Sequence, residues 1–481
     1  MKASNEIESL GGDGGLVTGS CHKLKIKPDS DVVIDYGLFQ GRKEERSDRG
    51  ERRNFTPTKD IAHGVTHILV THSHIDHTGL LPKIFRAGFT PKILATETTA
   101  VFMETMLYNS AKIQSHENIQ NRLYDEFDVN KSLRHLYIVD PFTEIPIGQK
   151  HSNNTAEFLP NGHVMGANSI IVRTGDKEQK QNILFTGDMG KPQQSLCGGY
   201  LDQVSKYPGD PINVLVVEST NFNKEPITFS EKRTNLLNGI KNVWKNGGNP
   251  LLPTLSFHRL QEIMEMIHNS QEDHLLEDCQ IFIDAPLGIS LLDNFKELNI
   301  DQLSLDYGDI QNYYQSKKAS KARFNLKNVT VIDSHEESLI NDEYLADYSG
   351  RCIIIASGGM GEHGRAVNYL RGKFCQNPKN AILFTCHQVD GTKGAAMVHY
   401  ENIPKGKSKG ARVIKIEGFT SHISGPTETF DFLERFNLDK LSTVIITHGK
   451  DTARKAMAGE FQRRGYDCNI VLPNLNQKVT I

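Results

Sequence analysis

One short stretch of this sequence, from Val65 to Gly79, constrains the fold and the chemistry more than any other. An apolar segment leads there into four side chains of metal-binding type, namely His72, His74, Asp76 and His77. His72 and His74 are two residues apart at a strand end, so their side chains point to the same side. Asp76 and His77 lie on the turn before a helix predicted over 78–85. This spacing suits two metal ions. Imidazole and carboxylate ligands favour Zn²⁺, with Mn²⁺ or Fe²⁺ left open by ligand type.

A histidine-rich surface turn is the alternative to a metal site here. We disfavour it because the residue types, their order and the preceding strand all agree with a metal site. Three later residues repeat the arrangement: His163 lies in a loop between two predicted strands, Asp188 follows the strand over 182–186, and His448 follows the strand over 443–447. Each of them would more often be structural if it stood alone. Together they would add two imidazoles and one bridging carboxylate.

Two further acids stand at strand ends. Asp35 follows an apolar strand and precedes Gly37, a position from which it could orient a ligand histidine, unless it only caps backbone amides of a turn. Glu218 ends an apolar strand, where an unpaired carboxylate is costly, so we expect a histidine or arginine partner. His422 lies in a glycine-flanked loop and is expected to be exposed.

The composition narrows the possible classes of function but does not identify one. The chain has 481 residues and a net charge of −3, which fits a large globular enzyme and neither favours nor excludes a nucleic-acid partner. Its seven cysteines are dispersed, as in proteins of a reducing compartment. No secretory signal is visible, and no apolar run approaches the ~20 residues of a membrane helix. We therefore expect a cytoplasmic protein without membrane contact.

The sequence pattern changes over residues 226–408, where predicted helices and strands alternate as in a separate α/β domain. Its glycine-rich loop from Ser357 to Arg365 follows a predicted strand and suits an oxyanion or a phosphate. An ion pair between domains is the alternative for Arg365. A mixed charge run over 42–53 indicates mainly a solvated face, with phosphate contact as the less favoured interpretation.

Taken in order, the strand-end residues resemble the five motifs of the metallo-β-lactamase superfamily. These motifs correspond to Asp35, His72-Ser-His74-Ile-Asp76-His77, His163, Asp188 and Thr447-His448-Gly449. The chain resembles more narrowly the β-CASP branch, and within it the compact bacterial RNA-processing ribonucleases related to the cleavage and polyadenylation endonuclease. The narrower resemblance rests on Leu38–Gly41, Glu218–Thr220, Arg259–Glu262, Ala356–Arg365, Gln388–Thr392 and Gly418–His422.

This resemblance implies a fold and its domain limits. The fold would be α/β, a metallo-β-lactamase αββα sandwich with an inserted α/β β-CASP domain. The sandwich would occupy residues 1–225 and return over 409–481, and the insertion would occupy residues 226–408. The chain departs from the usual pattern at Asn221-Phe222, at His258 and at Thr420–Ser424. These departures keep every ligand and bear on substrate preference.

The resemblance also implies how the metals would be bound. One Zn²⁺ would be held by His72, His74 and His163, and a second by Asp76, His77 and His448. Asp188 would bridge the two ions, and Asp35 would support a ligand histidine from behind.

The chemistry implied by the resemblance is hydrolysis of RNA phosphodiester bonds. A hydroxide held by the two zinc ions would attack the phosphorus in line, and His422, oriented by Glu218, would assist the leaving oxygen. Ser357 and Arg365 would bind phosphates of the substrate. A histidine at the position of His448 is associated in this family with RNA, so we expect a ribonuclease with RNA as its partner. Among ribonucleases, we expect an endonuclease.

Two other functions stay open at this point. A small-molecule ester, thioester or lactone hydrolase of the same superfamily would use the same metals but would leave Glu218, His422 and the large insertion without a role. A non-catalytic RNA-binding scaffold would not need the complete ligand set that the sequence retains. Cleavage from an RNA end and a homodimer also remain compatible with the sequence.

Overall fold

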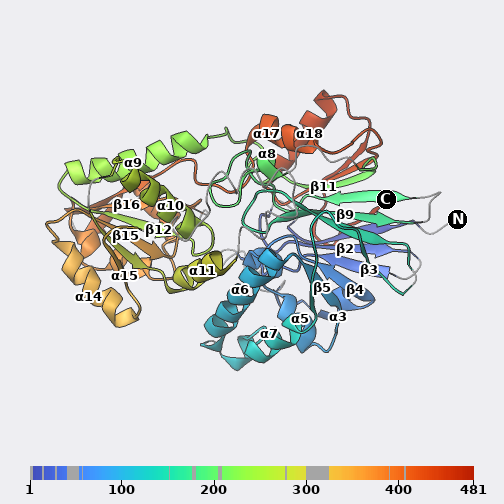
Figure 1. Ribbon diagram of the computed structural model, residues 1–481, viewed down its shortest axis with the longest axis horizontal. Coiled ribbons are helices and arrows are strands. Elements are labelled where there is room, and N and C mark those ends of the chain that lie inside the picture. The colour runs from blue at the N-terminus through green and yellow to red at the C-terminus, as the bar shows by residue number, and fades with distance from the viewer. Residues whose placement is uncertain are drawn as a thin grey trace. The chain divides into compact units, whose positions relative to one another are not determined.

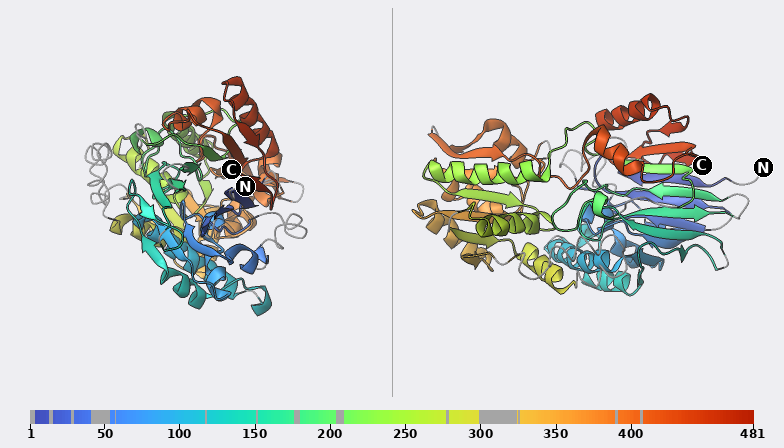
Figure 2. Two further views of the ribbon diagram at one scale, coloured as in Figure 1. Left: turned by 90° about the vertical axis from the view of Figure 1, so that its right-hand side faces the viewer. Right: turned by 45° about the horizontal axis from the view of Figure 1, so that its top comes forward.

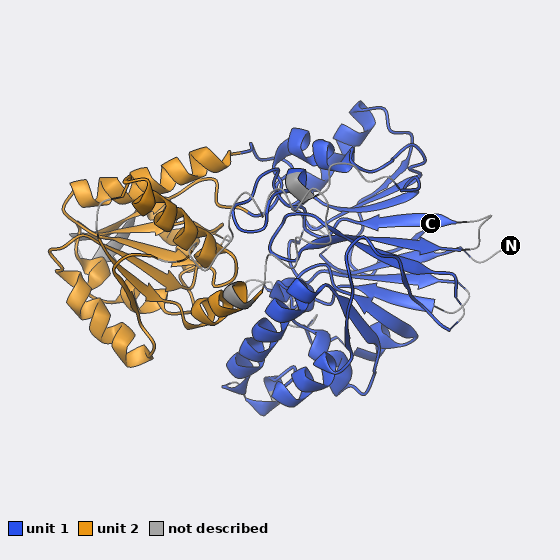
Figure 3. Cartoon of the chain, viewed as in Figure 1, with its two compact units in different colours: residues 1–226, 421–481 blue, residues 227–420 orange. Residues whose placement is uncertain are grey.

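The computed structural model describes most of the chain, namely residues 4–12, 16–27, 30–40, 54–56, 58–116, 118–150, 152–175, 180–203, 209–276, 279–298, 324, 326–388, 391–405 and 408–481. The charge run over 42–53 lies outside the described residues. The chain forms two compact units (Figure 3). Unit 1 comprises Met1–Pro226 and Ser421–Ile481, and unit 2 comprises Ile227–Thr420.

Within the described residues, unit 1 contains two seven-stranded sheets. The first has the order β21 (Lys478–Thr480), β1 (Glu6–Gly11), β2 (Cys21–Ile26), β3 (Ser30–Ile34), β4 (Val65–Leu69), β5 (Lys92–Ala95) and β6 (Leu136–Ile138). The second has the order β20 (Asn469–Val471), β19 (Thr443–Thr447), β11 (Val214–Glu218), β10 (Gln181–Phe185), β9 (Asn168–Thr174), β8 (Thr155–Pro160) and β7 (Ile145–Pro146). Strands of both sheets are rich in β-branched residues, which pack well on a pleated surface.

The two sheets of unit 1 share one apolar core, and each has helices on its other face. Leu24, Val32 and Leu69 of the first sheet belong to the same buried cluster as Ile170 and Val214 of the second. The helices on the outer faces are α5 (Leu81–Arg86), α6 (Glu97–Ser115) and α7 (Glu126–Leu133) on the first sheet, and α17 (Gly425–Leu433) and α18 (Asp451–Arg463) on the second. Figures 1 and 2 show these two helix groups on opposite sides of the strands. The αββα sandwich is therefore confirmed.

The other helical turns in the described part of unit 1 are short. They are α3 (Thr58–Ala62), α4 (Ile75–Thr78), η2 (Ile119–Asn121) and α8 (Tyr200–Gln203). The helix predicted over 78–85 is found as α5, but it begins at Leu81 instead of Thr78, because Thr78 ends α4 and a turn at Gly79 separates the two helices. Pro82 lies in the first turn of α5, and its missing N–H is tolerated at a helix start but not in a helix that continues from α4.

Strand direction explains where the polar residues gather. In the first sheet β3 is parallel to β4 and β4 to β5, and in the second β10 is parallel to β11 and β11 to β19. The carboxyl ends of parallel strands lie at one edge of a sheet, which is the usual position of a ligand site in α/β folds.

Unit 2 is a three-layer α/β structure. Its sheet has the order β14 (Val329–Val331), β13 (Gln280–Asp284), β15 (Cys352–Ser357), β12 (Pro250–Thr254), β16 (Ala381–Phe384), β18 (Ser408–Lys415) and β17 (Asn402–Lys405). The helices are α9 (Phe229–Lys245), α10 (Arg259–Glu272) and α11 (Pro286–Glu297) on one face, and α14 (His335–Ala346), α15 (Ala366–Arg371) and α16 (Lys393–Tyr400) on the other, with the short η4 (Phe374–Gln376).

The return to unit 1 lies later in the chain than the limit at residue 408 that we expected. Residue 408 begins β18, which pairs with β16 and so belongs to the sheet of unit 2. The chain re-enters unit 1 at Ser421. All seven cysteines are free thiols. Among the described helices, none combines the length and the apolar character that crossing a membrane requires.

Candidate metal centre

The strand ends of unit 1 deliver the site residues in the way that the sequence indicates. Asp35 follows β3, His72 and His74 follow β4, Asp188 follows β10, and His448 follows β19. Asp35 and His448 adopt φ angles of 58° and 45°, a left-handed conformation that is uncommon for residues other than glycine. Such conformations cost free energy and are found mainly where surrounding structure imposes them, as at functional sites.

The first group of candidate ligands is His72, His74, His163 and Asp188. His72 Nε2 lies 2.9 Å from His74 Nδ1, and His163 Nε2 lies 3.4 Å from the same atom. One ligand atom from each of the four residues lies within 4.8 Å of the others. Three ring nitrogens and a carboxylate oxygen thus converge on one point, as the ligands of a four-coordinate metal do.

The second group is Asp76, His77 and His448, whose ligand atoms also lie within 4.8 Å of one another. His77 Nδ1 lies 2.7 Å from Asp35 Oδ2. Thr71 donates to Asp35 from its backbone N–H and from its hydroxyl, each at 2.8 Å. With Nδ1–H donating to Asp35, the Nε2 atom of neutral His77 carries the lone pair, which fixes the ligand tautomer.

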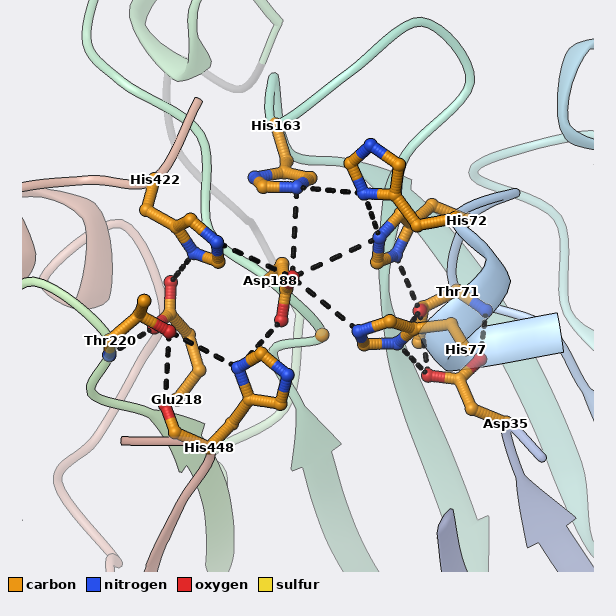
Figure 4. Close-up of polar contacts among 12 residues, drawn as sticks. Asp35, Thr71, His72, His77, His163, Asp188, Glu218, Thr220, His422 and His448 are labelled. Atoms are coloured by element: carbon orange, nitrogen blue, oxygen red, sulfur yellow. Dashed lines mark hydrogen bonds and ion pairs between the residues drawn. The ribbon is translucent and has the colours of Figure 1, made fainter. Parts of the chain in front are cut away.

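Asp188 lies at the centre of both groups (Figure 4). Five imidazoles surround its carboxylate: Oδ2 lies 3.9 Å from His72 Nε2, 3.4 Å from His77 Nε2, 3.6 Å from His163 Nε2 and 3.7 Å from His422 Nε2, and Oδ1 lies 3.3 Å from His448 Nδ1. Oδ2 thus faces rings of both groups and Oδ1 faces His448 of the second group, so this carboxylate is suited to contact two cations.

Burial and charge set the protonation of the cluster. Burial holds the pKa of His72 and of His163 well below the ordinary 6.5, and it lowers the pKa of His74 to about 4. These rings are therefore neutral at pH 7 and offer lone pairs. Burial also lowers the pKa of His77, but the carboxylates of Asp188 and Asp35 outweigh it and hold that pKa well above its ordinary value. A proton on His77 thus competes with a cation.

The cluster contains buried polar atoms that the protein does not satisfy. Among the described residues, His77 Nε2, Asp188 Oδ1 and His448 Nε2 have no hydrogen-bond partner. Buried polar atoms nearly always have a partner, and each exception calls for an explanation. Neutral imidazole nitrogens and carboxylate oxygens are the atoms that bind Zn²⁺, and also Mn²⁺ or Fe²⁺, so the residues present fit divalent cations.

Glu218 and His422 form a pair beside the cluster. His422 Nδ1 lies 3.0 Å from Glu218 Oε1, so the partner that burial of Glu218 requires is His422. Burial lowers the pKa of His422, but Glu218 and Asp188 outweigh it and raise that pKa. The expectation that His422 is exposed is wrong: its side chain is only 19% exposed, because it faces Glu218 on one side and packs against His163 with ring centroids 4.6 Å apart on the other.

The two predicted phosphate-binding residues lie in unit 2. The backbone N–H of Arg365 donates to Ser357 Oγ at 3.3 Å, so the loop brings these two residues together. The guanidinium Nε of Arg365 lies 3.6 Å from Asp284 Oδ1, and Nη2 donates to the carbonyl of Asp333 at 3.4 Å. The ion pair of Arg365 therefore lies within unit 2. Contact of Ser357 and Arg365 with a substrate stays a prediction.

Two supporting residues received no role from the sequence. Thr71 links Asp35 to the ligand strand, as described above. The hydroxyl of Thr220 donates to the carbonyl of His448 at 3.0 Å and lies 3.1 Å from His448 Nδ1, where it can accept from that ring and leave Nε2 free for a cation. The only signal in the sequence was position, since Thr71 directly precedes His72 and Thr220 lies two residues after Glu218.

Comparisons with known proteins agree with this geometry. Residues 24–217 match the Metallo-beta-lactamase superfamily, and residues 260–397 match the Beta-Casp domain. The chain is 26% identical over 465 residues to "Probable RNase MJ4" of Methanocaldococcus jannaschii, covering 95% of this chain and 96% of that protein. It is 25% identical over 462 residues to "Ribonuclease TTHA0252" of Thermus thermophilus, covering 94% and 95%. It is 25% identical over 474 residues to "Endoribonuclease ysh1" of Schizosaccharomyces pombe, covering 96% of this chain and 57% of that protein.

Proposed function

Because the chain belongs to the metallo-β-lactamase superfamily and carries a β-CASP domain, we propose that it is a metal-dependent ribonuclease that hydrolyses phosphodiester bonds of RNA. The names of the three relatives describe ribonucleases, and one of them an endoribonuclease. We infer internal cleavage for this chain by that analogy.

The observation that carries the proposal is the cluster around Asp188 together with the adjacent pair of Glu218 and His422. The metal groups alone would serve many hydrolases. His422 Nε2 lies 3.7 Å from Asp188 Oδ2, and its Nδ1 atom is held by Glu218. This arrangement is suited to proton transfer at a leaving group next to the metals.

Each candidate ligand would have one role. One cation would be held by His72, His74 and His163, and a second cation by Asp76, His77 and His448. Asp188 would contact both cations. The chemistry supplied by two bound cations would be a lower pKa of a shared water and stabilisation of charge on the phosphodiester. Glu218 accepts from His422 Nδ1, which leaves Nε2 as the atom that gives a proton to the departing 3′ oxygen.

Zinc is the cation that the ligand set favours, with manganese or iron as alternatives of similar ligand type. We assign RNA as the polymer because of His448, which the sequence resemblance associates with RNA substrates. Ser357 and Arg365 are proposed to contact phosphates of the substrate.

The test is cleavage of a structured, end-labelled RNA and of the matching DNA by zinc-loaded protein. We expect RNA to be cut at internal positions, a chelator to stop cleavage, and the DNA to be spared. Asp188→Ala should abolish cleavage. His116→Ala, which removes an exposed imidazole at the end of α6, should leave it unchanged.

Two results would overturn the proposal. If two equivalents of zinc bind and neither polymer is cut, the nuclease assignment fails and small-molecule ester or thioester substrates become the ones to assay. If RNA is cut equally well by the Asp188→Ala variant, the activity belongs to a contaminant.

A further inference from the structure

The loop that follows Asp188 holds the backbone of the segment that carries His422. The N–H of Ile423 donates to the carbonyl of Met189 at 2.9 Å, and Gly190 pairs with His422 in an antiparallel bridge. The N–H of Met189 donates to Glu218 Oε1 at 3.1 Å. One short loop therefore contacts both members of the acid–histidine pair.

The same loop lies directly against the segment of His163. The N–H of Gly190 donates to the carbonyl of Asn161 at 3.1 Å. A Cβ atom at position 190 would lie 2.0 Å from the carbonyl carbon of Gly162, so only glycine allows this approach. The segments of His163 and His422 are thus aligned on the two sides of one loop.

Gln194, in this loop, reaches both segments with a single amide group. Its side chain is buried, and Nε2 donates to the carbonyl of Ser421 at 3.2 Å and, over a longer distance of 3.5 Å, to the carbonyl of His163. Ser421 directly precedes His422 and is the first residue of unit 1 after the chain leaves unit 2. The bond from Gln194 spans 227 positions of sequence.

We propose that Gln194 is a positioning residue, which fixes the backbone of His422 relative to His163 and so sets the place of the His422 imidazole beside Asp188. Glu218 restrains only the Nδ1 end of the His422 ring. The position of Nε2 therefore also depends on the position of the His422 backbone. The amide of Gln194 supplies the donor without adding charge to the cluster. This inference rests on the proposed function, because its consequence for turnover requires that His422 acts on the leaving group.

The test is a double-mutant cycle of Gln194→Met and His422→Ala. Gln194→Met keeps the length of the side chain and removes the donor. Because other contacts of the loop remain, we expect kcat for RNA to fall about tenfold with KM and bound zinc unchanged, less than the roughly 10²-fold that a misplacement of 1 Å can cause. In the His422→Ala background the same substitution should cause no further loss, because residues that act as a unit are not additive.

The matched control is Asn182→Leu, which removes another buried amide of unit 1. Its Nδ2 donates to the carbonyl of Pro211 at 2.9 Å, at the end of β10 opposite to Asp188. We expect kcat to stay unchanged. Equal losses from Gln194→Met in both backgrounds, or a loss confined to thermal stability, would overturn the inference.

A second measurement separates this inference from the proposed function. In zinc-loaded protein with ¹³C-labelled histidine, the ring signal that disappears in His422→Ala identifies His422. This signal should shift or broaden in Gln194→Met and stay unchanged in Asn182→Leu. If the wild-type protein cuts no RNA, the proposed function fails, and the ring signal still decides whether Gln194 positions His422: an unchanged signal would refute it.

Discussion

Each unit contains a buried cluster of ionisable side chains, and the two clusters are compensated in different ways. In unit 2, Glu262 pairs through Oε1 with Lys232 and through Oε2 with Arg259, and all three side chains are buried. The ring of Phe419 covers both cations, 5.6 Å from Lys232 Nζ and 5.2 Å from Arg259 Cζ. In unit 1, the carboxylate of Asp188 faces five imidazoles, and His77 Nε2, Asp188 Oδ1 and His448 Nε2 lack hydrogen-bond partners among the described residues.

This difference distinguishes the cluster of Glu262, which stabilises the fold, from the cluster of Asp188, which is suited to bind cations. Burying charge is costly, and the protein can offset the cost with its own opposite charges or with a bound ion. Glu262 has a protein cation at each oxygen, so the protein itself compensates the charge of this carboxylate, although Arg259 Nε has no hydrogen-bond partner among the described residues. The cluster of Asp188 gathers rings that burial keeps neutral, those of His72, His74 and His163, around one carboxylate, a combination suited to bind cations.

The largest effect should follow from Asp188→Asn. The variant keeps the shape of the side chain but removes the charge that both metal groups share. We expect RNA cleavage to fall about 10³-fold or more and bound zinc to decrease. Metal content by atomic emission and single-turnover cleavage would measure this. Asp342→Asn, which changes a buried aspartate that accepts from Lys373 and Phe374 in unit 2, should alter neither quantity.

The next effect should follow from Glu262→Gln, which leaves Lys232 and Arg259 buried without their carboxylate. Breaking a buried pair in this way costs about 3–5 kcal/mol of unfolding free energy. Trp244 is the only tryptophan of the sequence and is buried in unit 2, so its fluorescence during denaturant unfolding reports on this unit. Bound zinc should not change. A loss of zinc would show that the two clusters are not independent.

The pH dependence of the same transition provides a control. Burial raises the pKa of Glu262, but Arg259 and Lys232 outweigh it and lower that pKa from 4.5 to about 2. The folded state therefore binds this proton less readily than the unfolded state. The stabilisation is present above about pH 4.5 and is lost as the pH falls through about 2. Glu262→Gln should show a shallower loss of stability across this window than the wild-type protein.

Removing the metal should have a smaller effect on stability. At a free zinc concentration of 100 times Kd, binding contributes about 2.7 kcal/mol to the folded state. A chelator should therefore lower the melting temperature seen by far-UV circular dichroism, while the transition reported by Trp244 should move less. Equal shifts of both transitions would contradict the assignment of the cations to unit 1.

The smallest effect should follow from Asp35→Asn. The amide oxygen can still accept from His77 Nδ1, but it no longer carries the charge that orients the ring. We expect zinc affinity to fall about 10–100-fold, measured by competition with a chromogenic chelator. Asp31→Asn, which changes the partner of Lys23 in the same sheet, should leave the affinity unchanged. Equal affinities in Asp35→Asn and the wild-type protein would remove Asp35 from the set of supporting residues.

The sequence predicts the strand-end residues of this site well, because two local rules fix them. A short apolar run predicts a strand, and a polar residue just after it lies at the carboxyl edge of a parallel sheet. Asp35, Asp188 and His448 all follow this pattern. The partner of Glu218 was predictable in kind, since a buried carboxylate needs a cation or a donor, although the burial of His422 was not.

Other features depend on contacts between distant segments and have no local signal. Gln194 lies in a loop without periodicity, and its partner Ser421 is separated from it by all of unit 2. The return to unit 1 depends on the pairing of β18 with β16, and a strand pattern alone does not reveal which sheet receives the strand. The break between α4 and α5 depends on one proline within an otherwise helical pattern.

The late position of β19 in the sequence has a consequence for biosynthesis. The first metal group is complete in sequence at residue 188, but His448 follows a strand that pairs with β11, 229 positions earlier at Val214–Thr443. During synthesis at about 5–20 residues per second, the second sheet therefore stays without its β19 neighbour while all of unit 2 emerges. The full set of candidate ligands is therefore present only after His448 has been synthesised.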